Sequence, residues 1–196
     1  FMEEMRRTLR PGLTPEELKE LSAYAVASAN RAVREAAMRS VDCRSMGTTL
    51  VSAVSWEGGA VISNVGDSRA YHITPEGITR VTKDHSLVES MVDRGDITAE
   101  EARHHPNRNL ITRALGPEEH IECDVYDVTL GADERLLLCS DGLTNMVPVE
   151  QMEQLLAQGP FYDLPDRLVD AANENGGSDN ITALLLAVEP TEVHHG

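Results

Sequence analysis

Aromatic and basic residues are scarce in this 196-residue chain. Phe, Trp and Tyr make up only 4% of it, so the hydrophobic core must be built from Leu, Val, Ile and Ala. The 17 Lys and Arg residues are outnumbered by 33 Asp and Glu residues, which gives a formal net charge of -16. That charge argues against nucleic acid or an anionic membrane surface as the main partner, because both are negatively charged. It suits a protein that concentrates cations, although acidity that only maintains solubility explains the composition equally well.

Cysteine is also rare, and long apolar runs are missing. Cys43, Cys123 and Cys139 are widely separated and form no CxxC pair or other zinc-ligand spacing, which favours reduced thiols. No apolar run approaches the roughly 18 residues that a membrane-spanning helix needs. The first residues are typical of an amphipathic helix and not of a signal peptide. We therefore expect a cytoplasmic protein with no membrane segment in this chain.

Several well-known catalytic motifs are absent. The sequence has no GxxxxGK[ST] phosphate-binding loop, no GxSxG serine elbow and no HExxH zinc motif. None of the three cysteines has a base beside it in sequence, so a thiol nucleophile has little support. These absences disfavour nucleotide hydrolysis through a P-loop, serine or thiol hydrolysis, and zinc peptidase chemistry.

The N-terminal part of the chain is predicted to be helical. Residues 1–9 form a first helix, which ends at Arg10-Pro11-Gly12. Thr14 and Glu17 form a capping box that starts a second helix, which continues to about Met38. The second helix has an Ala-rich stripe at spacings of three and four residues, which predicts close packing on a sheet or on another helix.

The period then changes from helix to strand. The sequence predicts short strands separated by turns that contain Gly and Asp, followed by further strands and two amphipathic helices. The predicted strands are 48–55, 60–65, 69–73, 78–81, 122–129, 135–140 and 181–188, and the helices are 149–156 and 164–173. This order predicts an α+β fold, a two-sheet β-sandwich flanked by helical layers.

Between the two groups of strands, residues 84–116 are predicted to be an insertion with two short helices. Ser86 with Glu89 and Thr98 with Glu101 have the spacing of capping boxes. The insertion carries a local basic cluster in an otherwise acidic chain: Arg103, His104, His105, Arg108 and Arg113. A solvated helical excursion and a lid that meets an anionic substrate explain this cluster equally well. We expect residues 1–190 to form one domain and residues 191–196 to be a mobile tail.

Three Asp residues lie where predicted strands end or turn. Asp67 lies in Gly66-Asp67-Ser68-Arg69, and Asp179 precedes the last strand. Asp141 follows the apolar run 136–140, and Gly142 behind it is predicted to allow a tight turn of the backbone. Carboxylates without nearby His or Cys ligands are the chemistry of Mg²⁺ or Mn²⁺. Two unit charges ~4 Å apart repel by about 4 kcal/mol at an effective dielectric constant of ~20, so grouped carboxylates bind cations or hold protons. A site that bridges two such ions suits hydrolysis of a phosphate ester by a metal-activated water.

Five motifs between about Met46 and Val188 resemble the PPM-type (protein phosphatase 2C-like) metal-dependent serine/threonine phosphatases in their bacterial form. In order, they are Met46-Gly47-Thr48-Thr49, Gly66-Asp67-Ser68-Arg69-Ala70-Tyr71, Asp84-His85-Ser86, Leu138-Cys139-Ser140-Asp141-Gly142-Leu143 and Gly177-Ser178-Asp179-Asn180-Ile181-Thr182. Each motif alone is weak, but five in order are specific.

The resemblance implies a fold, a metal and a set of ligands. It implies a binuclear Mg²⁺ or Mn²⁺ site at one end of the sandwich, with Asp141 and Asp179 as ligands. Asp67 and Asp141 would hold a third ion. A metal-bound water would then hydrolyse phosphoserine or phosphothreonine in protein substrates. Residues 84–116 would form the flap beside the active site, and the resemblance implies a structural role for His85 and Ser86.

The chain departs from the family pattern at its start. The family begins with an Arg-x-x-Asn-Glu-Asp-type strand and a second strand that ends in Asp-Gly-x-Gly-Gly, and neither motif occurs here. We therefore expect an N-terminally incomplete phosphatase domain with impaired activity, whose exposed sheet edges allow self-association or domain swapping. The alternatives are a non-catalytic relative that acts as a regulatory or binding module and a member of the sporulation-type branch.

Overall fold

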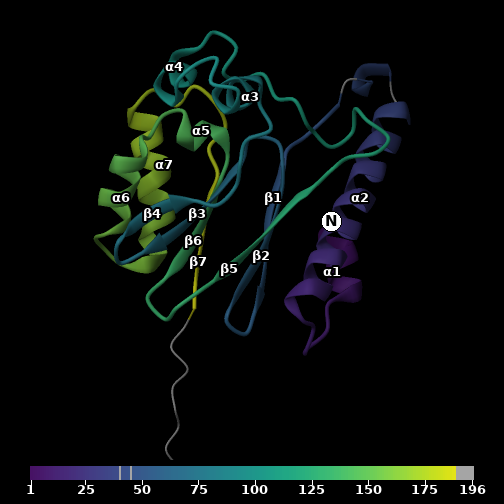
Figure 1. The fold of residues 1–196 in the computed structure, drawn as a ribbon, viewed down its shortest axis with the longest axis horizontal. Helices are drawn as coiled ribbons and strands as arrows, with labels where there is room; N and C mark the ends of the chain where they lie inside the picture. The colour runs from purple at the N-terminus through teal and green to yellow at the C-terminus, as the bar shows by residue number, and fades with distance from the viewer. Residues whose placement is uncertain (40, 45, 189–196) are drawn as a thin grey trace, which may run out of the picture.

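The computed structural model describes residues 1–39, 41–44 and 46–188, and its strands form two antiparallel sheets (Figure 1). One sheet has the order β1-β2-β5, with β1 at Leu50–Trp56, β2 at Gly59–Val65 and β5 at Asp124–Thr129. The other has the order β4-β3-β6-β7, with β3 at Arg69–Thr74, β4 at Gly77–Arg80, β6 at Arg135–Cys139 and β7 at Ala183–Ala187.

The two sheets pack face to face around a shared core. That core takes residues from both sheets: Ala60, Ile62, Ala70, Val128, Leu136 and Leu138. Alternate residues of the same strands face the other way and contact helices. In β6, Leu137 and Cys139 belong to a second core, as expected for a strand that is covered on both faces. Burial raises the pKa of the Cys139 thiol to about 12, so this residue packs as a small apolar side chain, as the sequence predicts.

Helices cover the outer face of each sheet (Figure 1). On one side lie α1 at Met2–Thr8 and α2 at Pro15–Arg39, which pack on β1 and β2. On the other side lie α5 at Asp141–Thr144, α6 at Val149–Leu156 and α7 at Leu164–Glu174. Two 3₁₀ turns, Val41–Cys43 and Phe161–Asp163, complete the described elements. The expected sandwich with helical layers is therefore confirmed. No helix among the described residues is both long and apolar enough to cross a bilayer.

The insertion carries α3 at Leu87–Asp93 and α4 at Ala99–His104. The capping box predicted at Thr98 and Glu101 is confirmed in both directions. The box predicted at Ser86 is only half formed: its hydroxyl accepts from the Glu89 N–H, but the Glu89 carboxylate binds Arg80 instead. Charge pairing with a guanidinium is stronger than a bond to a backbone N–H.

One strand boundary and one turn also differ from the sequence prediction. Strand β1 begins at Leu50, because Thr48 makes only an isolated bridge to Leu115. Asp141 opens a short helix instead of a turn. The mobile tail predicted at residues 191–196 lies outside the described residues, and the division into one domain with an insertion stays a prediction.

Candidate functional site

Asp67 lies in a tight turn between β2 and β3, here called the Asp67 turn (residues 66–68). Gly66 has a φ of 109°, and a Cβ at this position would lie 2.3 Å from the Thr49 Cγ2 atom. Only glycine fits these conditions. Beside it, the Ser68 hydroxyl contacts the Thr49 hydroxyl at 2.9 Å. The turn is therefore fixed on both sides of Asp67 by close packing and by a hydrogen bond.

The register of the second sheet brings the three predicted Asp residues to one end of the sandwich. Arg69 of β3 lies opposite Cys139 of β6, and Cys139 lies opposite Ala183 of β7. Asp67 comes two residues before Arg69, Asp141 two after Cys139, and Asp179 four before Ala183. Antiparallel pairing thus places all three on the same side of this row, beyond the ends of the strands.

Close packing joins the segments of Asp141 and Asp179. The Ser140 hydroxyl donates to the Asn180 carbonyl at 3.2 Å and accepts from the Thr182 N–H at 3.0 Å. A Cβ on Gly142 would lie 2.3 Å from the Asn180 carbonyl oxygen. The sequence interpretation of Gly142 as a turn residue is therefore wrong, since this glycine serves close approach and not an unusual backbone angle.

The three carboxylates interact electrostatically in two pairs. Burial and the nearby Asp141 raise the pKa of Asp67 to about 6. Burial and the nearby Asp179 raise the pKa of Asp141. Among the described residues, no three Asp, Glu, His or Cys side chains gather into one group that could hold a metal ion. Asp141 therefore interacts electrostatically with each of the other two carboxylates, but the three do not form one compact group.

The chemical type of these donors suits a hard divalent cation. Repulsion between carboxylates raises their pKa values when no cation is near, and a bound cation relieves it. The three side chains offer oxygen atoms alone, which is the ligand type that Mg²⁺ and Mn²⁺ prefer. Asp179 is exposed and accepts from the backbone N–H of Asn180 at 2.7 Å, so its carboxylate is accessible to solvent.

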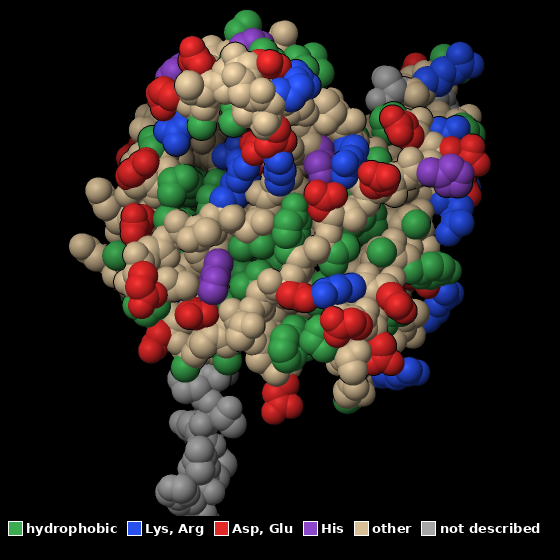
Figure 2. Space-filling model, viewed as in Figure 1, with side chains coloured by type: hydrophobic (Ala, Val, Ile, Leu, Met, Phe, Trp, Pro, Cys, Tyr) green, Lys and Arg blue, Asp and Glu red, His purple; other side chains and the backbone are tan. Residues whose placement is uncertain are grey.

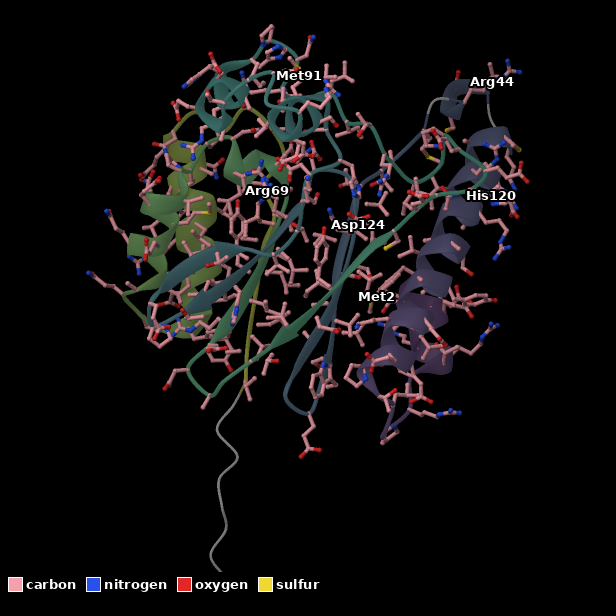
Figure 3. The ribbon with its side chains drawn as sticks, viewed as in Figure 1. Met2, Arg44, Arg69, Met91, His120 and Asp124 are labelled. Atoms are coloured by element: carbon pink, nitrogen blue, oxygen red, sulfur yellow. The ribbon has the colours of Figure 1, made fainter. Side chains whose placement is uncertain are left out.

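A buried ion pair lies beside the Asp67 turn. The Arg69 guanidinium donates to both carboxylate oxygens of Asp84, at 2.6 to 3.1 Å, and Asp84 is only 8% exposed. Arg69 also donates to the Tyr71 hydroxyl at 3.3 Å. Figure 3 shows Arg69 at the end of β3 nearest the insertion. Because its donors are engaged by Asp84, Arg69 holds the insertion to the sheet.

The sequence did not indicate that residues at the start of the insertion contribute to the candidate site. His85 is 7% exposed and contacts Gly66, Asp124 and Arg113. The sequence placed His85 in a matched motif, but nothing in it indicated that Asp124, 39 positions later, is its partner. The available signal was a run of three polar residues between a strand and a helix, and Asp84, His85 and Ser86 are all buried.

The basic cluster of the insertion does not converge on one point. Arg103 and His104 approach Glu100 of their own helix, at 3.8 and 3.3 Å. Arg113 instead binds Asp124 at 2.9 Å and approaches Glu122 at 3.6 Å. Figure 2 shows basic and acidic side chains intermixed below the insertion. The first two residues therefore fit a solvated helix, while Arg113 belongs to the end of the sandwich.

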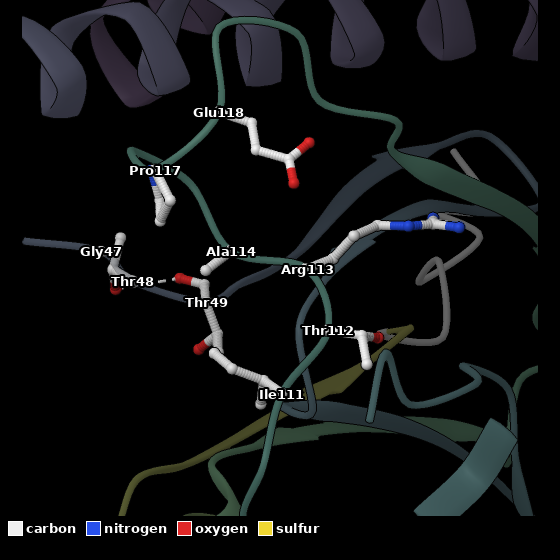
Figure 4. Close-up of a pocket in the computed structure, with 9 residues that line it drawn as sticks. All are labelled: Gly47, Thr48, Thr49, Ile111, Thr112, Arg113, Ala114, Pro117 and Glu118. Atoms are coloured by element: carbon white, nitrogen blue, oxygen red, sulfur yellow. Dashed lines mark hydrogen bonds between the residues drawn. The ribbon is translucent and has the colours of Figure 1, made fainter. Parts of the chain in front are cut away.

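A pocket of about 560 Å³ opens beside this end (Figure 4). Its lining comes from three segments: residues 47–49, residues 111–114, and Pro117 with Glu118. Thr49 also contacts Ser68 of the Asp67 turn. The pocket thus lies against the Asp67 turn, and segments from before β1 and from the end of the insertion form its walls.

Sequence comparison places the chain among bacterial phosphatases. The family model described as Protein phosphatase 2C matches residues 1–186. The serine/threonine phosphatase stp of Listeria monocytogenes is 40% identical over 181 residues, which is 92% of this chain and 72% of that protein. The protein phosphatase PhpP of Streptococcus pneumoniae is 39% identical over 146 residues, 74% of this chain and 59% of that protein.

Solved structures agree with the sequence comparison. The crystal structure of the serine/threonine phosphatase Stp1 from Staphylococcus aureus superposes with a TM-score of 0.89 at 35% identity, and covers 96% of this chain and 75% of that one. The catalytic domain of the serine/threonine protein phosphatase PstP, solved with two manganese ions, has a TM-score of 0.81 at 30% identity. That match covers 96% of this chain and 77% of that one.

Proposed function

Because this chain belongs to the protein phosphatase 2C family of bacterial serine/threonine phosphatases, we propose that it binds Mg²⁺ or Mn²⁺ through Asp67, Asp141 and Asp179. The family is metal-dependent, and a relative holds two manganese ions. The observation that carries the proposal is the strand register that brings the three Asp residues to one end of the sandwich, and the electrostatic interaction of Asp141 with both other carboxylates supports it.

The proposed reaction is hydrolysis of phosphoserine and phosphothreonine monoesters in proteins. A bound divalent cation supplies a more acidic water and neutralises charge on the phosphate. The residues of this chain hold their carboxylates in place: the Asp67 turn by packing on Thr49, and the Asp141 segment by the bonds of Ser140. Phosphoproteins are the proposed partners, and nucleic acid is not among them, since the chain carries a net charge of -16.

We further propose that this chain is weakly active or inactive by itself. Three carboxylates offer at most about six oxygen ligands, whereas two octahedral ions require about twelve positions between protein and water. Fewer protein ligands mean weaker binding of the metal. Self-association or domain swapping through exposed sheet edges remains a separate prediction, as does a cytoplasmic location.

The test of this proposal is hydrolysis of p-nitrophenyl phosphate with Mn²⁺, compared with hydrolysis of a phosphothreonine peptide. We expect slow turnover that requires Mn²⁺ and is lost on addition of a chelator. Fast turnover that Asp141→Asn abolishes would contradict the weak activity but support the metal site. Turnover that is indifferent to both chelator and Asp141→Asn would overturn the site itself.

A further inference from the structure

His85 joins the Asp67 turn to the end of the insertion. Its backbone N–H donates to the Gly66 carbonyl at 2.9 Å, and its carbonyl accepts from the Thr112 N–H at 2.8 Å. Its neighbour Ser86 forms an isolated antiparallel bridge with Ile111. His85 therefore lies between the turn that carries Asp67 and the segment 111–114, which lines the pocket.

The side chain of His85 makes a second link to the same turn. The Gly66 N–H donates to the Nδ1 atom of His85 at 3.0 Å. A ring nitrogen that accepts a hydrogen bond carries no proton, so the neutral ring must carry its proton on Nε2. Gly66 thus has both of its backbone polar groups bound by one residue, which fixes the peptide units on each side of it.

Asp124 holds the other side of the ring. The Nε2 atom of His85 lies 3.2 Å from the Asp124 Oδ2 atom, so the proton on Nε2 points to a carboxylate. Arg113 donates to the Oδ1 atom of the same carboxylate at 2.9 Å. The 3.1 Å approach of the Arg113 Nη1 atom to Nε2 is then a packing contact, because Nε2 has no free lone pair.

In metal centres, an outer-shell carboxylate commonly orients a histidine that is itself a ligand. The histidine oriented by Asp124 instead binds the backbone beside Asp67. Here the chain of contacts runs from Asp124 through His85 to Gly66, the residue before Asp67. Figure 3 shows Asp124 at the start of β5, on the other sheet from Arg69. The contact chain therefore ties the turn that leaves β2 to the start of β5, the neighbouring strand of the same sheet.

We propose that His85 is a positioning residue that holds the Asp67 carboxylate in its place for metal binding through the Gly66 N–H. The proposal rests on the proposed metal site at Asp67, Asp141 and Asp179. It assigns no contact between His85 and substrate or metal. His85 acts through the conformation of the Asp67 turn, and its Nδ1 lone pair is the feature that matters.

Two isosteric variants separate the two ring nitrogens. His85→Asn keeps an acceptor near the position of Nδ1 and loses the bond to Asp124. His85→Gln keeps a donor near the position of Nε2 and loses the acceptor for Gly66. Loss of an outer-shell partner typically costs about 10- to 100-fold in metal affinity. We therefore expect His85→Gln to weaken Mn²⁺ binding by about tenfold or more. His85→Asn should keep most of the Mn²⁺ affinity of the unmutated chain.

The measurements use the full chain and do not require activity. Isothermal titration with Mn²⁺ gives the affinity, and thermal unfolding reports whether each variant folds. His72→Gln is the matched control, since His72 also pairs with a carboxylate, Glu134 at 2.8 Å, but lies along β3 away from the turn. In ¹⁵N-labelled protein, a scalar coupling between the Gly66 nitrogen and the His85 Nδ1 nitrogen reports the hydrogen bond directly.

Each outcome decides the proposal. Binding by His85→Gln equal to that of the unmutated chain, in a folded protein, overturns the role of His85 but leaves the proposed function intact. Equal losses in His85→Asn and His85→Gln assign His85 to general stability and also overturn it. Absence of the Gly66–His85 coupling overturns it even if His85→Gln fails to fold. An unmutated chain that binds no Mn²⁺ overturns the proposed function and this inference together.

Discussion

The Asp67 turn and the loop that carries Asp179 (residues 176–180) lie at the same end of the sandwich, but they are held very differently. Gly66 is bound through both backbone polar groups, and Ser68 contacts Thr49. Asp179 is exposed and accepts from the next residue of its own loop. The turn beside the first candidate ligand is thus fixed on both sides before any cation arrives. The second candidate ligand has an exposed side chain, and its loop is joined to the Asp141 segment through Ser140.

This difference matters for a metal site. A fixed ligand loses little conformational freedom when a cation binds, whereas an exposed loop residue must be ordered. Asp141, at the start of α5, interacts electrostatically with both Asp67 and Asp179. We expect the fixed turn to determine where the cation binds, and the exposed loop to close the coordination afterwards. Four substitutions test this comparison, from the largest expected effect to the smallest.

Asp141→Asn removes the charge of the carboxylate that interacts with both Asp67 and Asp179. We expect Mn²⁺ affinity to fall by at least the roughly 10- to 100-fold that loss of an outer-shell partner costs. Calorimetric titration measures the change, and Asp133→Asn, an exposed residue before the opposite end of β6, is the control. Unchanged affinity in the first variant, or an equal loss in both, would remove Asp141 from the site.

Gly66→Ala breaks the fixed side of the comparison. The new Cβ would overlap Thr49, at 2.3 Å, in a backbone conformation that alanine avoids. We expect a loss of about 3 kcal/mol or more in the free energy of unfolding, measured with urea. Gly95→Ala is matched to it, since Gly95 has a φ of 74° and nothing within 4 Å of the added Cβ.

The control separates the two causes of strain. Gly95→Ala carries only the backbone term, about 1 to 2 kcal/mol. If the two alanine variants lose equal stability, close packing of the Asp67 turn on Thr49 contributes nothing, and the turn is less constrained than its contacts indicate.

Ser140→Ala loosens the loop that carries Asp179. It removes the bonds to Asn180 and Thr182. At a partly exposed position we expect a loss of about 1 kcal/mol in the free energy of unfolding. Amide hydrogen exchange should increase in residues 176–182 and stay unchanged in the Asp67 turn. Faster exchange in both segments would mean that the two sides are not held independently.

Asp124→Asn has the smallest expected effect and depends on pH. Burial opposes ionisation of Asp124, but the hydrogen bonds from His85 and Arg113 outweigh it and hold its pKa below the usual value. The ionised Asp124 carboxylate therefore stabilises the folded state fully above about pH 4, the pKa of an unfolded Asp. This stabilisation is lost as the pH falls through the lower pKa of Asp124 in the folded state.

We expect Asp124→Asn to cost less than about 1 kcal/mol near pH 7, because the side chain is partly exposed and screened by solvent. Urea unfolding of both proteins from pH 7 to pH 2 measures the difference. The free energies of unfolding of the two proteins should converge at the acid end. A difference that grows on acidification would contradict the lowered pKa of Asp124.

Much of the fold and part of the site could be predicted from the sequence. Alternating apolar residues and capping signals gave the strands and helices within a few residues, because these patterns depend on neighbours along the chain. The three Asp residues were identified because each follows or precedes an apolar run. The error at Gly142 has a different origin, since the reason for that glycine is Asn180, 38 positions away.

The sequence by itself determined which carboxylates are candidates for metal binding, and it determined the family through five ordered motifs. Only the tertiary structure decided how each is supported: His85 ties Gly66 to Asp124 and fixes Asp67, while Asp179 remains exposed. The physical reason is that the support comes from hydrogen bonds and packing between segments far apart in the chain. Strand register and the path of the insertion bring those segments together, and both depend on pairing between residues that are distant in sequence.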